Sequence, residues 1–129
     1  MAEQRLRSPL GRALGLGSAK EGVEHWWAQR VSALALIFLG LWFAAEVIAL
    51  AGADRATMLA WLHRPLPAIL TILLLAAVFY HAALGLQVVI EDYVHSEWLK
   101  LSSLAAMRLI SIGLAVAGIF AVLRIAFGG

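Results

Sequence analysis

Residues 66–90 read LPAILTILLLAAVFYHAALGLQVVI and contain no Asp, Glu, Lys or Arg. A helix needs roughly 20 apolar residues to cross the hydrocarbon core of a bilayer, and this stretch is long enough. It lacks the apolar–polar alternation of a transmembrane β-strand. Pro65 and Pro67 stand at its start, where a helix tolerates a missing N–H. The stretch therefore predicts a transmembrane helix.

Two further apolar stretches flank this one. Residues 31–51 contain a single charged residue, Glu46, and residues 101–127 contain Arg108 and Arg124. Both are also long enough to cross a membrane as helices. The sequence thus predicts an all-α membrane protein with three transmembrane helices, and so small a bundle is expected to be completed by a partner chain. The predicted helices cover about residues 28–51, 66–91 and 101–126.

The composition supports the same conclusion. Hydrophobic residues make up 63% of the 129 residues and charged residues 14%, whereas soluble proteins carry roughly 25% charged residues. A soluble fold of this size could not bury so much apolar surface. The chain has no cysteine, which excludes disulfides and cysteine-ligated iron–sulfur clusters within it.

Basic residues cluster before the first apolar stretch and predict the orientation of the chain. They are Arg5, Arg7, Arg12 and Lys20, followed by Arg30 at the helix entrance. Positive charge favours the cytoplasmic side, so the N-terminus is placed in the cytoplasm and, after three crossings, the C-terminus outside. We interpret the cluster as a topology signal, and no nucleic-acid binding is expected. Residues 1–27 are predicted to form a cytoplasmic arm and interfacial segment, and residues 28–127 the transmembrane domain.

His81 is the polar residue that most needs explanation. An ionisable side chain inside the hydrocarbon region is energetically costly and is by default a functional hypothesis. Its neighbours one helical turn away, Ala77 and Gly85, lie on the same face and are small. Such a face has room for a flat macrocycle whose iron the imidazole would ligate. The residues alone leave two interpretations open, haem ligation and a hydrogen bond to another helix.

Three other polar residues are candidates for a site. Asp92 follows His81 by eleven residues, which is three turns plus roughly 20°, so both share a face about 16 Å apart along the axis. Tyr93 offers a hydroxyl for a quinone carbonyl, and Asp92 could orient it or accept protons; alternatively both simply end a helix at the interface. Arg30 could pair with a haem propionate or extend to lipid phosphates.

Two motifs together resemble a known family. The first comprises GSAKEG at residues 17–22 and HWWAQRVSA at residues 25–33, and the second is HAALGLQVVIEDYV at residues 81–94. This combination, in this order and with three helices, resembles the hydrophobic membrane anchor subunits of succinate dehydrogenase, most closely the alphaproteobacterial form. The resemblance implies a multi-pass protein of the bacterial inner membrane, with a periplasmic C-terminus.

The resemblance also implies specific roles. His81 would be one axial ligand of a haem b iron, with the second histidine supplied by a cytochrome b556-like second anchor subunit. Arg30 falls where the family places a basic residue near the haem propionates. Tyr93 would contact ubiquinone, with Asp92 as its acidic neighbour. The flavoprotein and iron–sulfur subunits would carry succinate oxidation, so no catalytic residue for that step is expected in this chain.

Two alternative functions remain at this level. The chain could be the anchor subunit of a quinol:fumarate reductase, which runs the same chemistry in reverse. It could also be a non-haem structural or transport protein that uses Glu46 and His81 as proton-coupled groups. Transporters often contain interrupted helices at their binding sites, and neither Gly nor Pro interrupts the interior of these stretches in that way.

Overall fold

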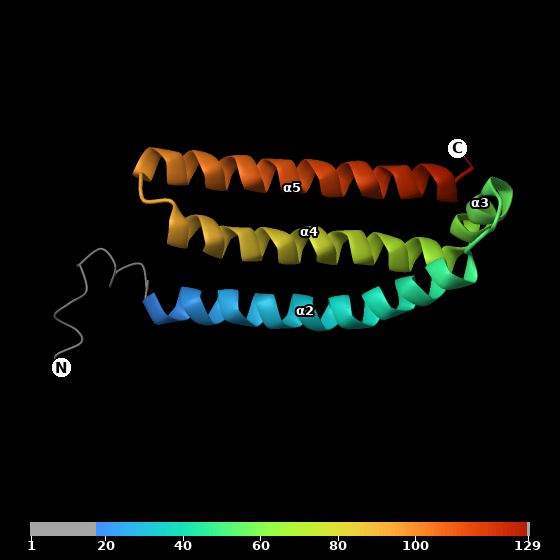
Figure 1. The fold of residues 1–129 in the computed structure, drawn as a ribbon, viewed down its shortest axis with the longest axis horizontal. Helices are drawn as coiled ribbons and strands as arrows, with labels where there is room; N and C mark the ends of the chain where they lie inside the picture. The colour runs from blue at the N-terminus through green and yellow to red at the C-terminus, as the bar shows by residue number, and fades with distance from the viewer. Residues whose placement is uncertain (1–17, 129) are drawn as a thin grey trace.

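The computed structural model describes residues 18–128 and contains only helices over that range. Three of them are long and apolar enough to cross a membrane, which confirms the predicted all-α architecture. A short helix follows the first long one and lies at one end of the molecule (Figure 1). The helices are α2 (Ser18–Ala49), α3 (Arg55–His63), α4 (Pro65–Tyr93) and α5 (Glu97–Ala126).

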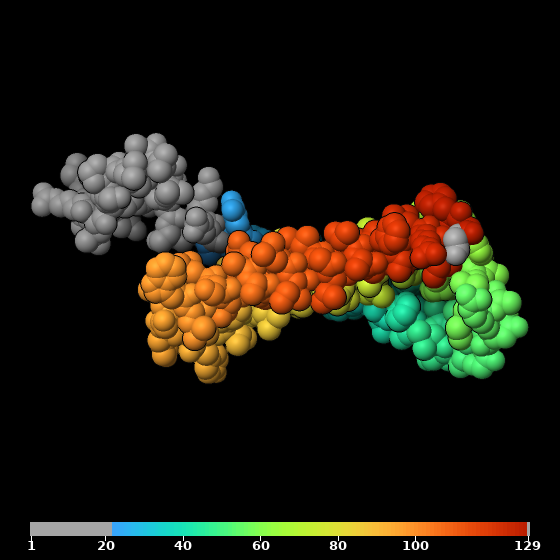
Figure 2. Space-filling view, turned by 90° about the horizontal axis from the view of Figure 1, so that it is seen from above, coloured from blue at the N-terminus to red at the C-terminus, as the bar shows by residue number. Residues whose placement is uncertain are grey.

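The three long helices lie side by side with α4 in the middle (Figure 1). Helix α4 packs against both α2 and α5, whereas the backbones of α2 and α5 do not approach each other closely within residues 18–128. Seen from above, α5 runs along the described molecule and α3 projects at the end where α2 finishes (Figure 2). Because the layer is one helix thick, both faces of α4 between its neighbours are open to lipid or to another chain.

The ends of the helices differ from the predicted bounds. Helix α2 begins at Ser18 rather than at about residue 28, so the predicted interfacial segment is already helical from that residue onwards. Helix α5 likewise begins at Glu97, before the apolar stretch starts. Hydropathy marks the part of a helix that lies in the hydrocarbon, whereas the helix continues wherever water or headgroups satisfy its surface. Residues 1–17 of the predicted arm lie outside the described residues.

Helix α3 was not predicted and fixes the end of α2. Asp54 caps it, because its Oδ1 accepts a hydrogen bond of 2.9 Å from the Thr57 N–H. The Trp61 indole donates to Glu46 Oε2 at 2.8 Å and stacks on Trp42 at 6.0 Å between ring centroids. Glu46, the charged residue of the first apolar stretch, is therefore satisfied by α3. This hydrogen bond gives the Glu46 carboxylate a structural role, so proton transport is not needed to explain a charged residue in this apolar stretch.

The Asp54 cap should make α3 sensitive to acid. Hydrogen bonds from the side chain and then the backbone N–H of Thr57 lower the pKa of Asp54 below its ordinary value of 3.8. A carboxylate whose pKa falls on folding stabilises the helix above that ordinary value, and the contribution is lost as the pH drops through the folded pKa. We expect hydrogen-exchange protection of the Thr57 amide to decline below pH 3.8. An Asp54→Asn variant that kept the same decline would contradict this assignment.

Few side chains are buried within the chain. The buried ones among the described residues are Ala68, Met107, Val122, Pro67 and Ser32. Large apolar residues are exposed along every long helix, as expected where lipid or a partner chain supplies the second half of the packing.

The small residues of α5 do not all serve its packing on α4. Gly113, Ala117 and Ala121 recur every four residues and are exposed, and a Cβ added at Gly113 would meet nothing within 4 Å. The close approach to α4 is made by Gly118, where a Cβ would lie 3.3 Å from Leu75 Cδ1. The stripe of Gly113, Ala117 and Ala121 is therefore left open to lipid or to another helix.

Candidate functional site

His81 lies at the interface between α4 and α2. Its Nδ1 is 2.9 Å from the hydroxyl oxygen of Ser32 on α2. Ser32 is 6% exposed, and its hydroxyl is 3.1 Å from the backbone carbonyl oxygen of Gln29. The hydrogen bond to another helix, one of the two interpretations left open by the sequence, is therefore formed.

The two hydrogen bonds of Ser32 are satisfied together by one tautomer of the His81 imidazole. A serine hydroxyl has a single proton to donate, and a carbonyl oxygen such as that of Gln29 can only accept. The hydroxyl satisfies both bonds only if it donates to the Gln29 carbonyl oxygen and its oxygen accepts from the Nδ1–H of His81. In a neutral imidazole the proton on Nδ1 leaves a lone pair on Nε2. This arrangement is compatible with metal ligation, because ligating histidines commonly donate their other N–H in this way.

A stripe of polar residues on α2 faces the same interface. His25, Gln29 and Ser32 are four and three residues apart and share one helix face, and we call them the α2 polar stripe. His25 Nε2 and Gln29 Oε1 are buried without a hydrogen-bond partner within the described residues. Gly85 lies opposite, since a Cβ added there would be 3.8 Å from Gln29 Nε2. Buried polar atoms normally have partners, so these two atoms need partners beyond those that residues 18–128 supply.

The single ligand His81 fits a metal held in a macrocycle better than it fits a bare metal ion. No group of three or more His, Asp or Glu side chains that could hold a metal ion occurs within residues 18–128. His81 can therefore serve a metal only as one ligand among several supplied elsewhere. A haem would meet this requirement, because a porphyrin brings four nitrogen ligands of its own. Gly85, however, packs against Gln29 of α2, so the space that the sequence suggested beside His81 is filled on that side by this chain.

Arg30 lies apart from these residues. Its side chain is exposed, and its guanidinium carbon is 5.4 Å from the centroid of the Trp26 ring, a cation–π contact. Arg30 is two residues before Ser32, which turns it by roughly 200° around the α2 axis. The structure therefore does not bring Arg30 to His81, and a contact with a propionate would require the side chain to leave Trp26.

Asp92 and Tyr93 are the last two residues of α4. The helix is unbroken from Pro65 to Tyr93, so the expected shared face of His81 and Asp92 follows from regular helix geometry. Both Asp92 and Tyr93 are exposed, and Tyr93 is 79% accessible. They lie at the end of the layer where α2 begins (Figure 1). We call this end the α2 N-terminal end.

Comparisons with known proteins agree with the arrangement. The family model described as Succinate dehydrogenase/Fumarate reductase transmembrane subunit matches residues 4–123. A succinate dehydrogenase hydrophobic membrane anchor subunit from Rickettsia bellii (strain RML369-C) is 37% identical over 116 residues, 90% of this chain and 93% of the relative. The protein of the same description from Paracoccus denitrificans is 39% identical over 89 residues, 69% of each chain. A succinate dehydrogenase membrane anchor subunit from Reclinomonas americana is 31% identical over 96 residues, 72% of this chain and 80% of the relative.

Proposed function

Since this chain belongs to the succinate dehydrogenase hydrophobic membrane anchor subunits, we propose that it co-ligates a haem b and forms part of a ubiquinone-reduction site. It would do so in a succinate:quinone oxidoreductase whose flavoprotein and iron–sulfur subunits oxidise succinate. Its N-terminus would lie in the cytoplasm and its C-terminus in the periplasm. The α2 N-terminal end would then face the cytoplasm, where a soluble iron–sulfur subunit would dock.

The hydrogen bond between His81 and Ser32 carries this proposal. It holds the imidazole against α2 through Nδ1, and Nε2 would be the nitrogen that ligates iron. The second axial histidine would come from a cytochrome b556-like second anchor subunit placed against the open side of the α2–α4 pair.

The α2 polar stripe would serve the polar edge of the haem. Gln29 and His25 lie one and two turns nearer the α2 N-terminal end than Ser32, and their buried Oε1 and Nε2 atoms lack partners among residues 18–128. His25 and Gln29 would hold polar groups of the haem, such as the propionates. Arg30 would join them only after leaving Trp26. When bound, the haem would supply a one-electron redox centre whose potential depends on its axial ligands and surroundings.

Tyr93 and Asp92 would act on the quinone. Ubiquinone reduction needs two electrons and two protons, and the electrons would come from the iron–sulfur subunit. The Tyr93 hydroxyl would donate a hydrogen bond to a quinone carbonyl, which becomes more basic as the ring is reduced. Asp92, adjacent and exposed, would exchange protons with water at the cytoplasmic surface. The partner anchor and the iron–sulfur subunit would close the rest of the pocket.

The anchoring function can be tested by omitting the chain. Cells would express the flavoprotein, iron–sulfur and second anchor subunits with or without this chain. With it, succinate:quinone activity should sediment with the membranes. Without it, succinate oxidation with an artificial dye should move to the soluble fraction and quinone reduction should disappear. Membrane-bound quinone reduction that persisted without this chain would contradict the proposal.

Ser32 should affect haem binding through His81. Ser32→Ala removes the acceptor for the Nδ1–H, and losing such a hydrogen bond lowers metal affinity about tenfold or more. We expect weaker haem retention during purification and a shifted midpoint potential in a redox titration of the complex. Ser32→Thr keeps the hydroxyl and should restore both. Ser102→Ala, on α5, is the matched control, and a potential shift of equal size in that variant would contradict a specific role.

A further inference from the structure

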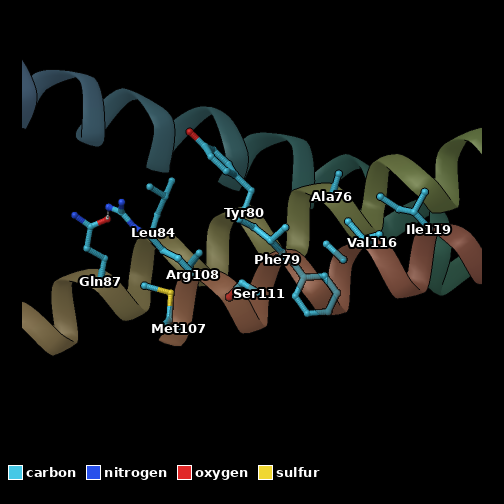
Figure 3. Close-up of a pocket in the computed structure, with 13 residues that line it drawn as sticks. Ala76, Phe79, Tyr80, Leu84, Gln87, Met107, Arg108, Ser111, Val116 and Ile119 are labelled. Atoms are coloured by element: carbon cyan, nitrogen blue, oxygen red, sulfur yellow. Dashed lines mark hydrogen bonds between the residues drawn. The ribbon is translucent and has the colours of Figure 1, made fainter. Parts of the chain in front are cut away.

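A groove runs between α4 and α5, and we call it the α4–α5 groove. Its volume is about 420 Å³ and its walls are almost entirely apolar. Gln87 and Arg108 lie together at one end, with Val116 and Ile119 toward the other (Figure 3). The middle is lined by Phe79, Ala83, Ser111 and Ala115.

The groove is separate from the proposed haem and quinone sites. Gln87 follows His81 by six residues, which places it roughly 120° away around the α4 axis. None of Ser32, His81, Asp92 and Tyr93 lines the groove. A ligand here would therefore leave the α2–α4 interface untouched.

The polar end of the groove contains a short hydrogen-bonded chain. Arg108 Nη2 donates to Gln87 Oε1 at 3.3 Å, and Gln87 Nε2 donates to Glu91 Oε1 at 2.9 Å. A guanidinium has five N–H donors, and the bond from Arg108 to the neutral amide is long and uses one of them. Arg108 is exposed, so its remaining donors are open to a ligand with several acceptor oxygens.

The depth of Arg108 indicates what that ligand is. Arg108 is eleven residues beyond Glu97, roughly 16 Å along α5 from its first residue. Helical side chains tilt toward the helix N-terminus, which for α5 is the α2 N-terminal end, so the guanidinium extends toward the headgroups of that leaflet. A cation at this depth is costly unless an anion accompanies it. A phosphate satisfies both charge and hydrogen-bond geometry.

We propose that the α4–α5 groove binds one anionic phospholipid from the leaflet at the α2 N-terminal end. Its phosphate accepts hydrogen bonds from Arg108, and one acyl chain lies along the groove. The distance from Arg108 to Ile119 is again eleven residues, or roughly 16 Å of apolar wall, which accommodates most of an extended acyl chain. A quinone carbonyl or an apolar helix would fill the groove but would not need the guanidinium.

The test measures lipid retention by the purified complex. The complete complex is reconstituted with equal amounts of palmitoyl-oleoyl phosphatidylglycerol and phosphatidylcholine, re-extracted in detergent and analysed by native mass spectrometry. The wild type should retain one phosphatidylglycerol in preference to phosphatidylcholine by about fivefold, the effect of one basic side chain near a lipid surface. Arg108→Gln should lose the preference, and Arg108→Lys should largely keep it. Arg124→Gln, which removes a basic residue outside the groove, is the matched control and should behave as the wild type.

A second variant tests the contribution of the apolar groove separately from that of the Arg108 charge. Ala115→Phe fills the middle of the groove and should lower retention of both lipids, with the subunits still co-purifying. Equal retention of the two lipids by the wild type would overturn the proposal. So would an unchanged preference in Arg108→Gln. Crosslinking of a photoreactive residue at position 112 to another subunit rather than to lipid would also overturn it, since a partner helix would then occupy the groove.

Discussion

Replacing Tyr93 with Phe is expected to lower quinone reduction by the assembled complex about 100-fold, the usual effect of removing one donor aimed at a developing oxyanion. The substitution removes the hydroxyl and keeps the ring, which is 79% exposed and supports little packing within this chain. Succinate oxidation with an artificial dye should be unchanged, because that reaction bypasses the quinone. The ratio of the two activities in one preparation is the measurement.

Tyr80→Phe provides the matched control for this prediction. Tyr80 is the other tyrosine of the chain, lies on the same helix and is also exposed, at 54%. It borders the α4–α5 groove rather than the quinone end. Equal losses in the two variants would mean that neither hydroxyl acts on the quinone specifically, and an unchanged Tyr93→Phe enzyme would remove this residue from the quinone site.

Replacing His81 with Ala is expected to remove almost all haem from the complex. The side chain would supply one of two axial bonds and the only one from this chain, and a methyl group cannot replace it. Ser32 would also lose its partner at 2.9 Å, so the α2–α4 interface would be weakened by one hydrogen bond, worth about 1 kcal/mol. Haem per complex is measured by extraction as the pyridine derivative. His63→Ala, at the opposite end of the layer, controls for loss of a histidine.

The long helices could be predicted because their signal is local. Twenty or more apolar residues in sequence specify a membrane-spanning helix whatever surrounds them. The helix ends were predicted less accurately than the helices themselves. The first turns of α2, which begins at Ser18, are polar and yet helical. Helix α3 has nine residues and no buried side chain. Only the Asp54 cap and the tertiary contacts with α2 therefore indicate this helix.

The candidate site was predictable only in part. His81 stands out as a lone ionisable residue in an apolar stretch, and the shared face with Asp92 follows from helix geometry. Its partner Ser32 is 49 residues away, and the register between α2 and α4 that joins them is not encoded in any local pattern. The spacing of His25, Gln29 and Ser32 did contain a signal, three polar residues on one face. Arg30 shows the opposite case. It is close in sequence to the α2 polar stripe, but it lies on another face of α2.

The dithionite-reduced minus oxidised absorbance spectrum of the co-expressed complex, with wild type and His81→Ala compared side by side, tests the central claim most directly. We predict a b-type band in the wild type that is lost or shifted in the variant while the subunits still co-purify. An identical b-type band in both would place the axial ligand elsewhere and leave the hydrogen bond between His81 and Ser32 a purely structural link between α4 and α2.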